Sequence, residues 1–176
     1  KQKPLIKFSR LEMNFLFRSE KRSICLIKRP THSKDSFLHF MKLFRRKILK
    51  RYYSDSVAGE KYIYFPFHVP LDVQLTVRCP EFLNQEVLVE QIAASIPDGY
   101  MLYIKEHPAA IGGHSLDEVK RLTALKNVRL LHPKNNSYDI IKNASCVITI
   151  NSKVGFEAIM QEKPVVVLGK TFYRGK

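Results

Sequence analysis

From residue 61 onward, short apolar segments alternate with segments of helical periodicity, and this alternation constrains the fold more than any other feature of the sequence. Five apolar segments are predicted to form strands: 61–67, 100–105, 128–131, 146–150 and 164–169. Helices are predicted between them: 85–96, 115–125, 136–143 and 153–163. Strands joined by helices form parallel sheets, because each parallel connection needs a crossover that covers the sheet. The sequence therefore predicts an α/β, Rossmann-like parallel sheet with helices on both faces.

The first 60 residues have a different character. They contain sixteen Lys and Arg but five Asp and Glu, so most of the net charge of +14 lies in the first third of the chain. Residues 36–53 place apolar side chains at helical spacing among basic ones, which predicts an amphipathic helix. We expect its apolar stripe to pack on a neighbour; the alternative is binding to a membrane surface or a polymer. The predicted organisation is a basic segment with helix and linker over 1–60 and a Rossmann-like domain over 61–176.

The cysteine content and the hydropathy of the chain indicate the cellular compartment to expect. The three cysteines are widely spaced and form no CxxC pair, which favours a reducing compartment. No apolar run approaches the length of a membrane span, and no secretory leader opens the chain. We therefore expect a cytoplasmic location, with peripheral contact at the inner membrane face as a further option.

Polar residues gather where the predicted strands end. Ligands of an open parallel sheet bind beyond the carboxyl ends of its strands, so these residues are expected to surround one site. They are His68 and Asp72 after the first strand, Lys105, Glu106, His107 and Pro108 at the second, and Asn151 and Ser152 after the fourth.

The helix after the fourth strand is predicted to begin at an anion site. Asn151 and Ser152 bring a hydroxyl, free backbone N–H groups and the positive end of the helix dipole to one point, where a phosphate fits. Lys153 adds positive charge, and Gly155 permits the close approach of a ligand or of neighbouring backbone. The equally weighted alternative is that Asn151 or Ser152 only caps the helix.

Two further clusters complete the candidate site. Pro108 fixes the turn after the second strand, and His107 can donate a hydrogen bond to a phosphate oxygen. His68 and Asp72 lie in a loop stiffened by two prolines, a relation that suits a base, a nucleophile or a group that orients an acceptor. His114, in a Gly-containing loop, is expected to be structural. No spacing of His, Cys or carboxylate residues predicts a metal site.

A resemblance to a known family rests on four segments in a fixed order: YFPFHVPLDVQLTVRCPEF, YIKEHP, TINSKVGFEAIMQEKPVVVLG and a final FY. Together they resemble the capsule polysaccharide biosynthesis family of bacterial glycosyltransferase-like proteins, over approximately 61–173. The family is similar to GT-B glycosyltransferases, so the resemblance implies one half of a GT-B-type architecture. Two departures are that QEKP stands where a small Gly-containing turn is common, and that the chain stops just after FY.

The resemblance also implies residue roles. Better-understood relatives transfer the acidic sugar Kdo from CMP-Kdo during capsule assembly. His107 and Pro108 match the HP motif and Ser152 matches the serine motif, both implied to hold the CMP moiety. Glu157 falls on the acidic position of the same helix. Asp72 matches the acidic position after the first strand, which makes it the leading catalytic residue.

The predicted function is that of a glycosyltransferase-like domain for bacterial capsule or surface polysaccharide synthesis, and the chain would supply half of its cleft. The expected partners are a nucleotide-sugar donor, with a CMP-sugar favoured, and a polysaccharide or glycolipid acceptor; peripheral contact with an anionic membrane is a further option. No cofactor and no metal are expected, and nucleic acid is not an expected partner. One alternative is a CDP-glycerol-type glycerophosphotransferase that uses the same pocket. The other is a non-catalytic basic module that binds membrane or acidic polymer.

Overall fold

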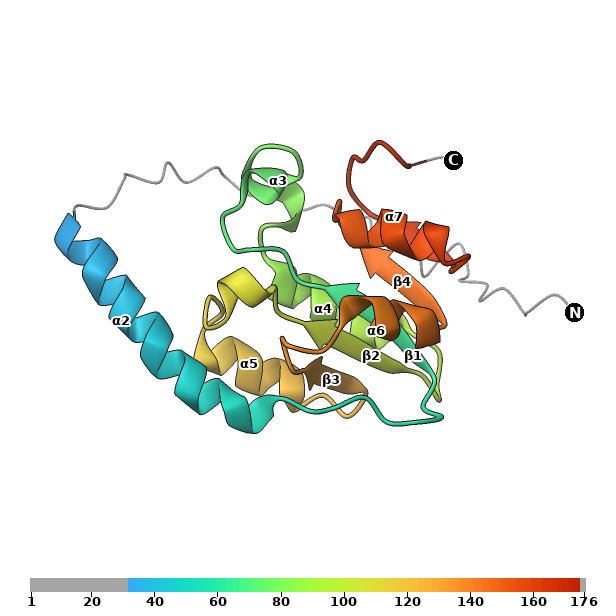
Figure 1. Cartoon of the computed structure of the whole chain (residues 1–176), viewed down its shortest axis with the longest axis horizontal. Coiled ribbons are helices and arrows are strands. Elements are labelled where there is room, and N and C mark those ends of the chain that lie inside the picture. Colours follow the sequence, from blue (N-terminus) through green and yellow to red (C-terminus); the bar gives the residue numbers. More distant parts are fainter. Residues whose placement is uncertain (1–31, 175–176) are drawn as a thin grey trace, which may run out of the picture.

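The computed structural model describes residues 32–174, in which helices surround a single sheet (Figure 1). Residues 1–31, the first half of the predicted basic segment, and residues 175–176 lie outside the described residues. All strand pairs of the sheet are parallel, and the strand order is β3-β2-β1-β4-β5. The strands are β1 (Tyr62–Pro66), β2 (Met101–Lys105), β3 (Val128–Leu131), β4 (Cys146–Thr149) and β5 (Val165–Val167).

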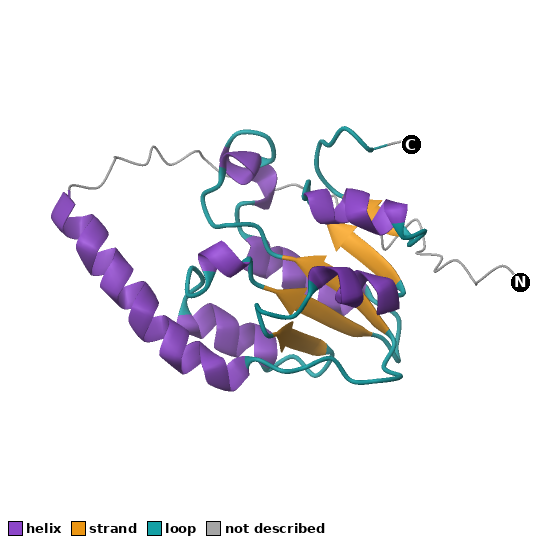
Figure 2. Cartoon of the chain, in the orientation of Figure 1, coloured by secondary structure: helices purple, strands orange, loops and turns teal. Residues whose placement is uncertain are grey.

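Helices connect the strands as the sequence predicts (Figure 2). The α-helices are α2 (His32–Leu49), α3 (Val73–Thr76), α4 (Gln85–Ser95), α5 (Leu116–Thr123), α6 (Ser137–Asn143) and α7 (Lys153–Met160). Short 3-10 helices are η1 (Lys50–Tyr52), η2 (Pro80–Phe82) and η3 (Pro108–Ala110). Helix α7 ends three residues before its predicted end at residue 163. Glu162 adopts a left-handed conformation with φ 55°. Pro164 in turn disfavours helical backbone at Lys163, the residue before it.

The two predicted helix starts at Ser115 and Asn84 have different outcomes. Ser115 and Glu118 form the predicted capping box: Ser115 Oγ accepts from Glu118 N at 3.2 Å, and Glu118 Oε2 accepts from Ser115 N at 2.7 Å. Asn84 precedes α4 as predicted, but its side chain makes no capping hydrogen bond. The first turn of α4 is tied instead through Gln85, which bonds to the loop after β1.

Successive residues of the central strands point to opposite faces of the sheet and fill two separate cores. One face, here the aliphatic face, packs β1 and β2 against α4 and α5, through residues such as Ile63, Phe65, Ile104, Val89 and Leu122. The other, here the tyrosine face, packs the same strands against α6 and α7, through residues such as Tyr62, Tyr64, Tyr103, Ile141 and Ala158. These two cores confirm the predicted fold class, a Rossmann-like parallel sheet covered on both faces.

The tyrosine face combines apolar packing with polar contacts. The rings of Tyr62 and Tyr103 stack with their centroids 4.0 Å apart, and the Tyr62 hydroxyl donates to the carbonyl oxygen of Ile140 at 2.7 Å. Burial raises the pKa of Tyr62 to about 12. These hydroxyls therefore stay protonated at neutral pH and act as hydrogen-bond donors within the core.

Helix α2 packs on the domain at its C-terminal end and extends away from it at its N-terminal end (Figure 1). Leu49 is completely buried in the aliphatic core, whereas Phe40 and Phe44 are 65% and 55% exposed. The expectation that the whole apolar stripe packs on a neighbour is therefore wrong for these two residues. Beyond α2, Ser54 forms a parallel bridge with Leu131, which extends the edge of the sheet. Among residues 32–174, no helix has the length and hydropathy needed to cross a bilayer.

Candidate functional site

The strand order places a topological switch point between β1 and β4. The chain runs from β1 to β2 and β3 on one side of the sheet, then returns to place β4 on the other side of β1. Ligands of such sheets bind in the crevice beyond the carboxyl ends at this point. His68 and Asp72 follow β1, and Ser152 follows β4, so the predicted catalytic and anion-binding residues lie at the same end of two neighbouring strands.

Ser152 forms the N-cap of α7. Its Oγ accepts a hydrogen bond from Val154 N at 3.3 Å, and its N–H donates to Thr149 Oγ1 at 3.2 Å. Capping and anion binding are compatible here, because a hydroxyl that accepts one hydrogen bond still has a proton to donate. The first turn of α7 contains no acidic residue, so the positive end of its dipole is not neutralised by its own helix.

Tyr173 and Gly155 fix this junction from the other side. Tyr173 is buried, its hydroxyl donates to the carbonyl oxygen of Ser152, and burial raises its pKa. A Cβ added at Gly155 would lie 2.6 Å from the Tyr173 hydroxyl oxygen and 2.8 Å from Thr149 Cγ2, too close for nonbonded atoms. The close approach that Gly155 permits is therefore that of the Tyr173 side chain, a contact that no local sequence pattern predicts.

Asn151 joins β4 to the loop that follows β1. Its amide nitrogen donates to the carbonyl oxygen of Gln74 at 2.8 Å and lies 3.3 Å from Cys79 Sγ. Within residues 32–174, its Oδ1 is buried and has no hydrogen-bond partner. Asn151 thus links the two segments that flank the crevice, a contact that fixes their separation.

His68 is held at the start of the loop after β1 by the side chain of Gln85. Gln85 Oε1 accepts from His68 N at 2.7 Å, and Gln85 Nε2 donates to His68 O at 3.2 Å. Burial lowers the pKa of His68; the Asp72 carboxylate acts to raise it, and His107 acts to lower it further. His68 is therefore a neutral imidazole at pH 7, within electrostatic reach of both Asp72 and His107.

Asp72 begins α3 from a tight turn. Its N–H donates to the carbonyl oxygen of Val69 at 3.1 Å, and the residue before it, Leu71, has a left-handed backbone with φ 64°. That conformation costs a non-glycine residue about 1 kcal/mol. Asp72 is half-buried, and its side chain makes no capping hydrogen bond to α3. The carboxylate is thus not used to start the helix that it precedes.

His107 presents a hydrogen-bond donor to solvent. Its Nδ1 accepts from Ala109 N at 3.2 Å, at the start of the 3-10 turn that Pro108 opens. A backbone N–H can only donate, so Nδ1 carries no proton and Nε2 carries it in the neutral ring. His107 is exposed, so this Nε2–H is accessible to a ligand. This geometry suits the donor role that the sequence predicts for His107.

Lys105 and Glu106 are buried on opposite faces of the sheet, because adjacent residues of a strand alternate. Lys105 Nζ donates to Asn135 O at 2.6 Å and to Ser137 Oγ at 2.7 Å, and burial lowers its pKa. Glu106 Oε2 accepts from the Tyr53 hydroxyl at 2.5 Å. The structure therefore does not present either side chain beside the exposed ring of His107.

Lys153 and Glu157 form an ion pair one turn apart on α7, with Nζ and Oε1 3.5 Å apart. Lys153 is highly exposed, so this pair stabilises the helix little. Burial raises the pKa of Tyr64, and the nearby Glu157 carboxylate adds to that effect. Glu157 therefore lies where α7 meets the tyrosine face, one turn along α7 from Lys153.

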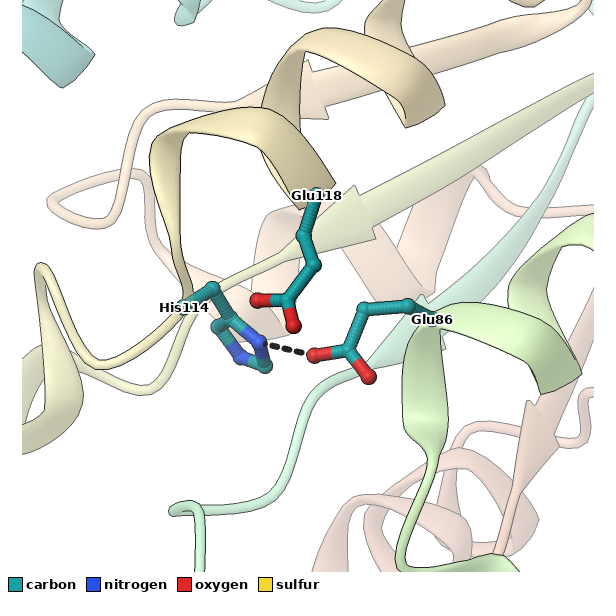
Figure 3. Close-up of side chains that lie close together, drawn as sticks. All are labelled: Glu86, His114 and Glu118. Atoms are coloured by element: carbon teal, nitrogen blue, oxygen red, sulfur yellow. Dashed lines mark hydrogen bonds and ion pairs between the residues drawn. The ribbon is translucent and has the colours of Figure 1, made fainter.

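One cluster of functional groups was missed by the sequence analysis. Glu86 from α4, Glu118 from α5 and His114 from the loop before α5 converge at one point (Figure 3). His114 Nδ1 lies 2.6 Å from Glu86 Oε1. Burial acts to raise the pKa of Glu86, but its hydrogen bonds and the nearby charges of His114 and Arg121 outweigh burial, and the net pKa is lowered. Glu86 is therefore ionised at neutral pH.

Comparisons with known proteins agree with this fold class. Protein FixF of Sinorhizobium fredii is 32% identical over 133 residues, which is 70% of this chain and 30% of that protein. Capsule polysaccharide modification protein LipA of Neisseria meningitidis serogroup A is 28% identical over 95 residues, 54% of this chain and 13% of LipA. Lipopolysaccharide-processing protein LpsZ of Rhizobium meliloti is 25% identical over 104 residues, which is 59% of this chain and 23% of LpsZ. The chain thus spans less than a third of each relative.

Solved structures with this fold include two KpsC chains from one organism. The KpsC beta Kdo 2,7 transferase of Thermosulfurimonas dismutans superposes with a TM-score of 0.54 and 25% identity, over 84% of this chain and 50% of that one. The KpsC beta Kdo 2,4 transferase of the same organism superposes with a TM-score of 0.53 and 19% identity, over 84% of this chain and 48% of that one. At this identity the likeness is one of fold alone. The family model described as "Capsule polysaccharide biosynthesis protein" matches residues 31–176. The chain therefore belongs to the capsule polysaccharide biosynthesis protein family.

Proposed function

We propose that this chain is the nucleotide-sugar-binding half of a glycosyltransferase that extends a capsule or surface polysaccharide, with a CMP-sugar as its donor. The observation that carries the proposal is the position of the α7 N-terminus at the switch point, beside the loop that bears His68 and Asp72. A helix N-terminus suited to an anion and a carboxylate at the same switch point support a donor site there. The resemblance to Kdo transferases of the same fold supports a sugar donor.

In the proposed reaction, an acceptor hydroxyl replaces CMP at the anomeric carbon of the donor sugar. The bond between the anomeric carbon and the phosphate oxygen breaks, and CMP leaves with the electron pair. The N-terminus of α7, the Ser152 hydroxyl and His107 Nε2–H stabilise the charge on the leaving phosphate. Asp72 acts as the base that takes the acceptor proton or as the nucleophile, and neutral His68 orients the groups beside it.

Titration calorimetry with CMP, CDP and UDP tests the donor site. We expect saturable CMP binding that weakens about tenfold or more in Ser152→Ala and in His107→Ala, because each removes a hydrogen bond to a charged group. The chain offers matched controls. Ser115 also caps a helix, and His132 Nδ1 also accepts from a backbone N–H, that of Lys134 at 3.1 Å. Ser115→Ala and His132→Ala should leave CMP affinity within twofold.

Other results would favour the other functions. Tighter binding of CDP than of CMP, lost in the same two variants, would favour a glycerophosphotransferase. A basic binding module would bind all three nucleotides with equal affinity. That affinity would fall steeply with salt and would be the same in Ser152→Ala and His107→Ala as in the unaltered chain.

The basic residues of α2 and η1 supply a second part of the proposal, peripheral contact with an anionic membrane. Exposed Phe40 and Phe44 lie on the same helix as exposed Lys47. Apolar and basic side chains together bind anionic bilayers. Reversal of Lys47, Lys50 and Arg51 to Glu should abolish sedimentation with phosphatidylserine vesicles, whereas reversal of exposed Lys120 and Lys134 should not. If the variant with three reversed charges on α2 and η1 sediments as much as the variant with Lys120 and Lys134 reversed, the proposed membrane contact is wrong.

A further inference from the structure

Three potential metal ligands from different parts of the chain meet beside the aliphatic core. The ligand atoms of Glu86, His114 and Glu118 all lie within 4.8 Å of one another, and Figure 3 shows the three side chains converging from α4, α5 and the loop between β2 and α5. His114 is 4% exposed. Helix packing and a loop therefore bring together an imidazole and two carboxylates in a largely buried place.

Among the described residues, the charges of this cluster are not balanced by neighbouring basic groups. Two carboxylates face one histidine, so even a protonated His114 would leave a net negative charge. Arg121 is the basic residue that acts on Glu86, but its Nε is bound to Glu90 Oε1 at 2.5 Å on the surface. Buried carboxylates without a compensating cation are strongly disfavoured.

Two buried polar atoms beside this cluster lack a hydrogen-bond partner among the described residues. Glu106 lines a cavity together with His114 and Glu118, and it is only 1% exposed. One of its oxygens, Oε1, has no hydrogen-bond partner in the described part of the chain, and the same holds for Nε2 of His114. The cavity measures about 10 Å³, room for one water-sized particle, and its other walls are mainly aliphatic and aromatic.

We propose that Glu86, His114 and Glu118 bind one divalent transition-metal cation. An imidazole nitrogen with carboxylate oxygens is a ligand set suited to Zn²⁺, with bonds of about 2.0–2.2 Å. On binding, the cation replaces the proton that His114 and Glu86 share. The second carboxylate oxygen of Glu118 remains available, because its Oε2 accepts the capping hydrogen bond from Ser115.

The cation would fix a loop that matters for the proposed donor site. The segment between β2 and α5 carries His107 near its start and His114 near its end, so a cation bound at His114 and held by α4 and α5 anchors one end of it. The site is thus structural: it does not touch the crevice residues themselves. Metal binding is measured without any nucleotide, so its failure would leave the proposed transferase function untouched.

The test uses the chain without an affinity tag, stripped with EDTA and then dialysed with Zn²⁺. We expect about one zinc per chain by mass spectrometry. At a free Zn²⁺ concentration about 100 times the Kd, we expect Tm to rise by roughly 5 °C or more and to return to its starting value with EDTA. Zinc retention should be lost in both Glu86→Gln and His114→Gln. Anomalous diffraction at the zinc edge would locate the ion.

Glu90→Gln is the matched control. Glu90 lies one turn along α4 from Glu86 and bonds to Arg121, yet it is outside the cluster, so this variant should bind zinc like the unaltered chain. Glu86→Gln keeps the size of the side chain, so its fold should persist even where His114→Gln unfolds. Equal zinc content in the unaltered chain and Glu86→Gln, or a Tm insensitive to both Zn²⁺ and EDTA, would show that the cluster is a hydrogen-bonded ion pair and would overturn the proposal.

Discussion

The β4–α7 junction and the loop after β1 are neighbours at the carboxyl edge of the sheet, but they are held in different ways. At the junction, Gly155 leaves space that Tyr173 fills, and Tyr173 in turn bonds to the carbonyl oxygen of Ser152. Residues 67–79 after β1, which include α3 and are here the β1 loop, are tied to that junction through Asn151, whose amide donates to the carbonyl oxygen of Gln74. Three of its apolar side chains are 60% or more exposed: Leu71, Val73 and Val77.

This difference suggests a division of roles. A phosphate is bound best by groups that are already fixed in position, because no ordering cost then arises on binding. The closely packed junction has that property. The β1 loop instead combines the half-buried carboxylate of Asp72 with exposed apolar surface, as expected where a second domain or an acceptor approaches. From this comparison we expect the junction to bind the proposed donor and the β1 loop to take part in the proposed reaction.

The largest effect is expected from Asp72→Asn in the full-length protein. If the β1 loop reacts and the junction binds, turnover should fall at least about 10³-fold, roughly 4 kcal/mol, while donor affinity stays within about threefold. Initial rates of sugar transfer and calorimetry of donor binding measure the two quantities separately. Asp98→Asn, in an exposed turn at the opposite end of β2, is the control and should change neither.

Two outcomes for Asp72→Asn would break the comparison. A parallel loss of stability, binding and turnover would indicate that Asp72 supports the turn at Val69 and α3. Near-normal turnover in a stable variant would remove Asp72 from the mechanism and leave catalysis to parts of the protein beyond this chain.

An intermediate effect is expected from Gly155→Ala, which tests the rigidity of the junction. The added Cβ would collide with the Tyr173 hydroxyl and with Thr149, so the free energy of unfolding should fall by about 2 kcal/mol in urea titrations. Tyr173→Phe removes the nearest colliding atom. In a double-mutant cycle, adding Tyr173→Phe to Gly155→Ala should cost less than Tyr173→Phe alone. Strict additivity of the two changes would show that the junction is more compliant than its packing implies.

The sequence predicted the sheet well because most strand residues are apolar and the helices between them have local start signals. The capping box at Ser115 depends on residues three apart, and it is present as predicted. The opposite orientations of Lys105 and Glu106 also follow from the sequence, since adjacent strand residues point to opposite faces of a sheet. The prediction that both side chains line one ligand site conflicts with this alternation.

Other parts of the site could not be read from the sequence, because they depend on contacts between distant segments. The contact of Tyr173 with Gly155 joins a residue after β5 to the start of α7. Glu86 and His114 are 28 positions apart and meet only because α4 and α5 pack on the same face. Local patterns specify strands and caps, whereas such contacts follow from the three-dimensional packing of helices on the sheet.

The smallest effect is expected from Leu71→Gly, which tests whether the β1 loop stores strain beside Asp72. Glycine adopts φ near 64° without the clash that a Cβ causes, and the lost Leu71 side chain is 64% exposed. The free energy of unfolding should therefore rise, by up to about 1 kcal/mol. Val73→Gly is the control, since Val73 is similarly exposed but helical, and it should lower stability by a similar amount. If strain holds the carboxylate of Asp72 in place, Leu71→Gly should also slow turnover severalfold without weakening donor binding. A gain in stability with unchanged turnover would mean that the left-handed turn only shapes the chain, and that Asp72 is positioned by the contacts of α3 and Asn151 instead.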